Sequence, residues 1–78
     1  MNTIRVYVNG QGVDVPRGAT ALDALRVADP DAARLVEEGK RALVDSRGLG
    51  LSPTAVLSAG SIVRVVSARA AGEKADGP

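Results

Sequence analysis

Cysteine and histidine are both absent from this 78-residue sequence. Without cysteine the chain has no disulfide, no thiolate nucleophile and no thiolate metal ligand. Without histidine it lacks the usual general base at neutral pH, the Ser-His-Asp and Cys-His nucleophilic sites, and any imidazole metal ligand. We therefore expect no catalytic residue, no metal site and no bound cofactor, and we do not expect an autonomous enzyme.

Aromatic residues are almost missing as well, since there is no Phe or Trp and a single Tyr. The core must therefore be aliphatic, and the length leaves room for one such core. Ten Lys and Arg residues against nine Asp and Glu give a net charge of +1. This charge is too balanced for binding to nucleic acid by counterion release, and there are no aromatic residues on which bases would stack. No apolar run approaches the ~20 residues of a membrane span, and no signal-peptide pattern is seen. We expect a cytoplasmic protein without nucleic-acid or membrane partners.

Residues 3–16 predict a β-hairpin. In "TIRVYVN" three branched aliphatic residues alternate with Arg5, Tyr7 and Asn9, which is the period of a half-buried strand. "NGQG" then supplies residues that tolerate a positive φ, and the alternation resumes in "VDV". Pro16 ends the second strand because it has no N–H to donate.

Two short helices are predicted next. Thr20 and Asp23 have the spacing of a capping box before an amphipathic segment that contains Leu22 and Leu25. The second helix would begin after Asp29, with proline at its first position, and end at Gly39. Capping and helix-end positions are also the simplest explanation for the neighbouring carboxylates, Asp29 with Asp31 and Glu37 with Glu38.

The remaining residues predict further strands. "RALVD" (41–45) precedes a turn and a short piece, "LGL" (49–51), and "SIVRVVSA" (61–68) is the last strand. Between them, Val56 and Leu57 are expected to fill the core. The Gly48-Leu49-Gly50 stretch lacks the Lys-Ser/Thr pair and the following helix of a phosphate loop, so we expect a plain turn.

This order of elements predicts an α+β fold. We expect a β-grasp (ubiquitin-like) mixed sheet of four to five strands, packed on one main helix and accompanied by a second short helix. The first and last strands would lie parallel and adjacent in the middle. The domain would span residues 1–67, and residues 68–78, which contain only small, polar and charged side chains, would form a flexible tail.

Two segments carry a family resemblance. "VYVNGQGVDVPRGATALDAL" resembles the opening of the ThiS/MoaD-type sulfur carriers, in which a strand leads through "VNG" and "P-x-G-x-T" to an apolar helix. "LSAGSIVRVV" resembles their closing turn and last strand. The second helix, "PDAARLVEE", makes the middle more similar to the MoaD branch. The resemblance implies a carrier that an adenylyltransferase of ThiF/MoeB type activates at its C-terminal carboxylate. A sulfur-accepting biosynthetic enzyme would be the second partner.

The C-terminus departs from that family, whose members end in Gly-Gly. Ala71 and Gly72 stand at the corresponding place, and "EKADGP" follows them. Three explanations remain open. A protease removes the last six residues and exposes Gly72, or the domain is a non-covalent protein-binding module without conjugation, or the last residues are a remnant of a fusion.

Either function needs a surface that binds a partner. With the branched aliphatic residues of the first and last strands facing the helix, the opposite face would carry an apolar patch with two arginines. We expect the partner-binding residues to be Arg5, Tyr7, Ile62, Arg64 and Val66.

Overall fold

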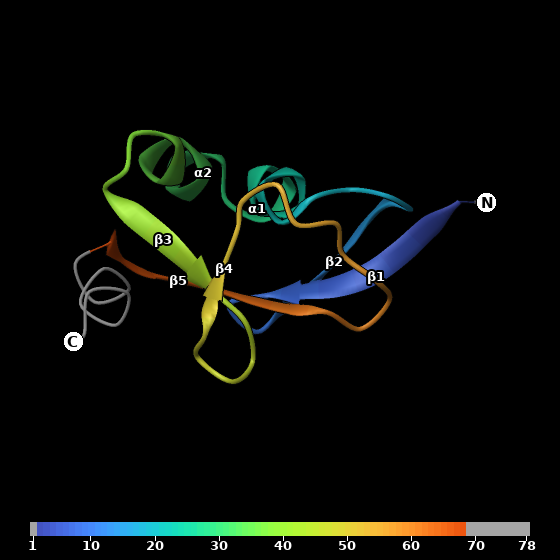
Figure 1. Cartoon of the computed structure of the whole chain (residues 1–78). Coiled ribbons are helices and arrows are strands. Elements are labelled where there is room, and N and C mark those ends of the chain that lie inside the picture. The colour runs from blue at the N-terminus through green and yellow to red at the C-terminus, as the bar shows by residue number, and fades with distance from the viewer. Residues whose placement is uncertain (1, 69–78) are drawn as a thin grey trace.

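The computed structural model describes residues 2–68 of the chain, which form one sheet with two helices on one of its faces (Figure 1). The elements are β1 (Thr3–Val8), β2 (Gln11–Pro16), α1 (Ala21–Ala28), α2 (Pro30–Glu37), β3 (Arg41–Val44), β4 (Gly50–Leu51) and β5 (Ile62–Ser67).

The sheet has the strand order β2-β1-β5-β3-β4. β5 is therefore the central strand, and it runs parallel to β1, with Tyr7 opposite Ile62 and Val8 opposite Val63. The pairs β1–β2, β3–β5 and β3–β4 are antiparallel. The expectation of an α+β fold with a mixed sheet and adjacent parallel first and last strands is confirmed. The arrangement is β-grasp-like.

The core lies between the sheet and the two helices, and it is aliphatic as the composition requires. Val6 and Val63 from the central strands and Leu25 from α1 are fully buried at its centre. Leu22 is partly buried and packs against the same cluster. Alanines at 21 and 24 are fully buried too, and their short side chains allow α1 to lie close to the strands.

Both helix starts are capped as predicted. The backbone N–H of Asp23 donates to Oγ1 of Thr20 at 3.1 Å, and the N–H of Thr20 donates back to Oδ2 of Asp23 at 3.1 Å. Oδ1 of Asp29 accepts from the N–H of Ala32 at 3.2 Å at the start of α2. Among the helix-end carboxylates, Glu37 forms an ion pair with Arg26 and so connects the two helices.

One core prediction was wrong. Leu57 is buried as expected, but Val56 is 69% exposed. The segment is extended here, since Val56 forms a β-bridge with Thr20 and the N–H of Leu57 donates to the carbonyl of Ala19. Neighbouring side chains of an extended chain point to opposite sides, so only one of the two can face the core.

The strand boundaries differ slightly from the expected ones. β1 stops at Val8 because Asn9 already has the positive φ of the hairpin turn. β3 stops at Val44 because the carboxylate of Asp45 turns inward to the loop and accepts from the N–H groups of Arg47 and Leu49. None of the helices among residues 2–68 is long and apolar enough to cross a membrane.

Candidate functional site: the open face of the sheet

The sheet has one face without helices, which we call the open face. The alternation along β1 shows which residues point to it, because Ile4, Val6 and Val8 are buried on the opposite face, against the helices. Arg5 and Tyr7 therefore point to the open face. Tyr7 is 39% exposed, and its neighbour across the parallel pair, Ile62, is 42% exposed. These values place two large side chains side by side at the surface.

β5 supplies the remaining expected residues. Val63 is fully buried on the helix side, so Ile62, Arg64 and Val66 alternate onto the open face. Arg64 is exposed and Val66 is half-buried. All five residues expected to bind a partner thus lie on one face of the two central strands.

The open face also contains two residues of β3 that sequence reasoning did not place there. Val44 is paired with Arg64, and Ala42 with Val66, so both share the face of their partners. Val44 is only 5% exposed, although it does not belong to the core cluster under the helices. An apolar strip therefore runs from Tyr7 and Ile62 toward β3. No sequence signal identified it, because nothing local shows which strand flanks β5.

Gly12 is a further residue of this face that we had assigned to the turn. It lies within β2 opposite Tyr7. A Cβ atom built there would lie 3.2 Å from Nη1 of Arg5 and 3.3 Å from Cε1 of Tyr7. The side chains of Arg5 and Tyr7 therefore lean over Gly12, and a larger residue at this position would have to displace them.

The two arginines of the open face differ in their electrostatic state. Arg5 forms an ion pair with Asp14 on β2, with Nε 3.2 Å from Oδ1 and Nη2 3.3 Å from Oδ2. Arg64 has no ion pair with any residue of the described range 2–68. Among residues 2–68, only one of the two flanking cations is thus neutralised by an ion pair.

The carboxylates with perturbed pKa values have structural roles. Hydrogen bonds from Thr20, its backbone N–H first, lower the pKa of Asp23 below its usual value. The N–H of Leu49 is the main cause of the lowered pKa of Asp45. Both groups are therefore anions that hold a helix start and a turn, and they are not poised to exchange protons near neutral pH. Residues 2–68 contain no group of three or more Asp and Glu side chains arranged to hold a metal ion.

The segment around Gly48 is a turn whose backbone donors are already engaged by Asp45. Oδ1 of Asp45 accepts from the N–H of Arg47 at 2.8 Å and from the N–H of Leu49 at 3.1 Å. These backbone donors are the groups with which a loop would hold a phosphate. Because a carboxylate already occupies them, the turn interpretation agrees with the structure.

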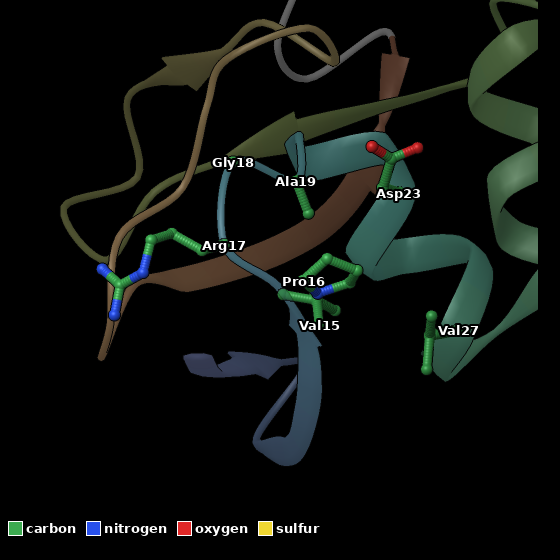
Figure 2. A pocket seen from close by; sticks show the side chains of 7 residues that line it. All are labelled: Val15, Pro16, Arg17, Gly18, Ala19, Asp23 and Val27. Atoms are coloured by element: carbon green, nitrogen blue, oxygen red, sulfur yellow. The ribbon is translucent and has the colours of Figure 1, made fainter. Parts of the chain in front are cut away.

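A hollow of about 460 Å³ lies between the end of β2 and α1 (Figure 2). Val15 and Val27 contribute apolar walls, while the side chain of Arg17 extends away from α1. Asp23, the other charged residue at its edge, is engaged in the capping box. The charged groups do not converge on a common point, so the hollow has no polar set that would orient a small ligand.

A second hollow, of about 300 Å³, adjoins the open face at Ile62. The exposed Val56 and the buried Leu57 line it together with polar residues of the β3–β4 turn. It therefore lies at the N-terminal end of β5, next to the surface formed by Tyr7 and Ile62. The candidate functional site is therefore the open face, whose large apolar side chains come from three neighbouring strands.

The remaining predicted site residues, Ala71 and Gly72, lie outside the described residues. The last described contact of β5 with its surroundings is a hydrogen bond of 3.3 Å from the N–H of Ala68 to the carbonyl of Lys40. The predicted tail begins at this point.

Comparison with known proteins adds no relative: no family model, no curated protein and no solved structure matches the chain.

Proposed function

We propose that this protein is a cytoplasmic sulfur carrier of the ThiS/MoaD type, and that its reactive end is Gly72 after the removal of residues 73–78. The observation that supports this most is the central position of β5. β5 contributes Ile62, Arg64 and Val66 to the open face, and the same strand leads directly into the C-terminal residues. A partner bound to the open face would therefore receive the chain end without any rearrangement of the fold.

The number of residues after β5 suits this task. Gly72 follows the last residue of β5, Ser67, by five residues. Five residues of extended chain span about 17 Å. A partner that covers the open face could thus take up the terminal carboxylate in an active site well beyond the edge of the sheet. Four of the five residues after Ser67 are Ala or Gly, and the exception is Arg69. Small residues suit an arm that enters a narrow channel, and glycine adopts backbone angles that other residues avoid.

The proposed chemistry takes place at the carboxylate of Gly72. A carboxylate oxygen attacks the α-phosphorus of ATP in the adenylyltransferase, and pyrophosphate leaves. A sulfur donor then attacks the acyl carbon, and AMP leaves with the oxygen that bridged them. When the donor is a persulfide, this attack leaves an acyl disulfide. A thiol then cleaves its S–S bond, which leaves a disulfide on the donor and a thiocarboxylate at the chain end, and a sulfur-accepting enzyme consumes the thiocarboxylate. The carrier itself provides no acid or base, which agrees with its lack of His and Cys.

Intact-mass spectrometry of the protein from its native host tests this proposal. We expect a species that ends at Gly72, part of it heavier by the difference between sulfur and oxygen. In vitro, a version ending at Gly72 should be adenylated by an adenylyltransferase of ThiF/MoeB type, and the full chain ending at Pro78 should not.

Two variants of the shortened protein provide the controls. Ala71→Gly should accelerate adenylation, because it removes a methyl group from the arm. Gly72→Ala should slow adenylation strongly, because it adds a methyl group beside the reacting carbon. If both variants react like the parent, the arm does not enter a restrictive channel, and the proposed reason for small residues at positions 71 and 72 is contradicted.

A non-covalent binding module is the second candidate. Two sequence observations favour it: alanine stands at position 71 where the carriers have glycine, and six residues follow Gly72. In that case the open face would bind its partner without any reaction at the C-terminus. A native protein that always extends to Pro78, together with a Gly72-terminated form that yields no adenylate, would favour this function over the carrier.

A further inference from the structure

Arg64 occupies the middle of the open face. On β5 it lies between Ile62 and Val66, and on β3 it is paired with Val44. These three neighbours are aliphatic, whereas on the β1 side Arg64 lies beside the polar Asn9, which is bonded to Val63 and Val65. Its side chain is exposed and forms no ion pair with residues 2–68. A charge without a counter-charge among residues 2–68 therefore lies between three aliphatic side chains on the surface that we propose as the interface.

The other charges of this face cancel each other. Arg5 is held by Asp14 through two contacts, at 3.2 and 3.3 Å, so this pair brings its own counter-charge to an interface. Arg17 and Arg41 also lack an ion pair within residues 2–68, but they lie elsewhere. Arg17 follows β2 in a loop. Arg41 is opposite Ser67, one residue out of phase with Val66, and so it lies on the helix side.

We infer that the partner places a carboxylate against Arg64. A protein that covers Tyr7, Ile62 and Val66 must remove water from the guanidinium between them. Leaving that cation without a counter-charge would cost more than the apolar contacts around it supply. An Asp or Glu carboxylate of the partner, placed inside these apolar contacts, would accept two parallel hydrogen bonds from the guanidinium. The partner surface must therefore be acidic at this point and apolar around it.

This inference rests on the proposed function for the kind of partner, which is the adenylyltransferase. Arg64 and Gly72 are eight residues apart in the sequence, and β5 ends at Ser67 between them. An ion pair at Arg64 would therefore hold β5 at a defined place on the enzyme and limit where the arm begins. Arg64 acts as a positioning residue that does not touch the reacting atoms, so its loss should weaken the capture of the carrier.

The test uses carriers that end at Gly72 and the ThiF/MoeB-type adenylyltransferases of the source organism. ATP–pyrophosphate exchange is measured against carrier concentration to give KM and kcat. Arg64→Glu should raise the KM for the carrier at least tenfold, because it sets like charges against each other. Arg64→Lys should recover part of the loss, since it keeps the charge but not the planar fork.

Arg41→Glu is the matched control. It makes the same change of net charge at an exposed arginine without an ion pair in the described part, but on the other face of the sheet. It should change KM less than twofold. Reversing the charge of the enzyme's acidic residue that pairs with Arg64 should restore the affinity for the Arg64→Glu carrier. Urea unfolding must show equal stability of both carrier variants.

The outcomes separate the inference from the proposed function. If the parent carrier is adenylated and Arg64→Glu reacts with an unchanged KM, the carboxylate at Arg64 is refuted and the carrier function stands. If Arg41→Glu raises KM as much as Arg64→Glu does, the effect is one of net charge and the inference is also refuted. If no adenylyltransferase acts on the parent carrier, the proposed function fails and the inference fails with it.

Discussion

The side-chain oxygen of Asn9 accepts a hydrogen bond from the backbone N–H of Val65, at 3.0 Å and across 56 positions of the sequence. β1 ends at Val8, and its last backbone contact to β5 is the bond from the N–H of Asn9 to the carbonyl of Val63. The next N–H of β5 that points toward β1 is that of Val65, and it would have no backbone acceptor there. Asn9, which has a φ of 51°, turns out of the strand and supplies the missing acceptor from its side chain. The hairpin turn thus holds the central strand at the point where β1 ends.

Removing this acceptor should destabilise the domain. Asn9→Gly keeps a residue that accepts the positive φ but loses the side-chain oxygen, so we expect a loss of about 1 kcal/mol in the free energy of unfolding. Asn9→Ala should lose roughly 1 kcal/mol more, because alanine is strained at this φ. Urea unfolding measures both, and Asn9→Asp, which keeps an acceptor, serves as the control. A glycine variant as stable as the parent would show that the contact contributes nothing.

The centre of the core should be sensitive to truncation. Leu25 is fully buried between α1 and the sheet, so Leu25→Ala should cost about 2–5 kcal/mol through lost burial and a cavity. Val27 is on the same helix but 59% exposed, and Val27→Ala should change stability by less than about 0.5 kcal/mol. Thermal or urea unfolding compares the two. Similar losses for both variants would contradict the position of α1.

The phase of β1 can be tested at two neighbouring residues. Val6 is fully buried and Tyr7 lies on the open face. Val6→Ala should cost about 2 kcal/mol, and the larger truncation Tyr7→Ala should cost less than about 1 kcal/mol. Tyr7→Ala should instead weaken partner binding. The reverse order of stabilities would mean that the strand is shifted by one residue, because such a shift exchanges the two faces.

The capping carboxylate of α1 should make stability depend on pH in acid. The pKa of Asp23 is lowered in the folded state from 3.8, so the folded protein binds this proton less readily than the unfolded chain does. Its contribution is therefore complete above the unfolded pKa, and it is lost as the pH falls from about 4 toward the folded pKa. Asp23→Ala should unfold at lower urea concentration at pH 7 and lose less of its stability on acidification. Arg41→Ala, which removes an arginine that takes no part in either lowered pKa, should retain the parent's acid dependence. A parent-like slope in Asp23→Ala would contradict this role.

Local signals were enough for most elements. The alternation around Ile4 and Val6, the capping pair of Thr20 and Asp23, and the proline after Asp29 each depend on interactions within a few residues. Such interactions can be read from spacing alone. The same alternation also predicted the face of each expected interface residue on β1 and β5, and the structure places all of them there.

The predictions that failed or were missing concern contacts between distant segments. Val56 and Leu57 looked equally suited to the core, and the bridge to Thr20 decided which of them faces it. The strip formed by Val44 on the open face depends on the pairing of β3 with β5. Composition and spacing do not encode such a pairing locally.

The sequence by itself determined an aliphatic core, a hairpin, two capped helices and the phase of the central strands, because each follows from a local period or a local hydrogen bond. Only the tertiary structure decided that Arg5 is neutralised by Asp14 while Arg64 has no counter-charge among residues 2–68. It also decided that the side chain of Asn9 accepts a hydrogen bond from Val65 of β5. Both depend on which strands become neighbours, and that is set by how the whole chain buries its apolar surface at once.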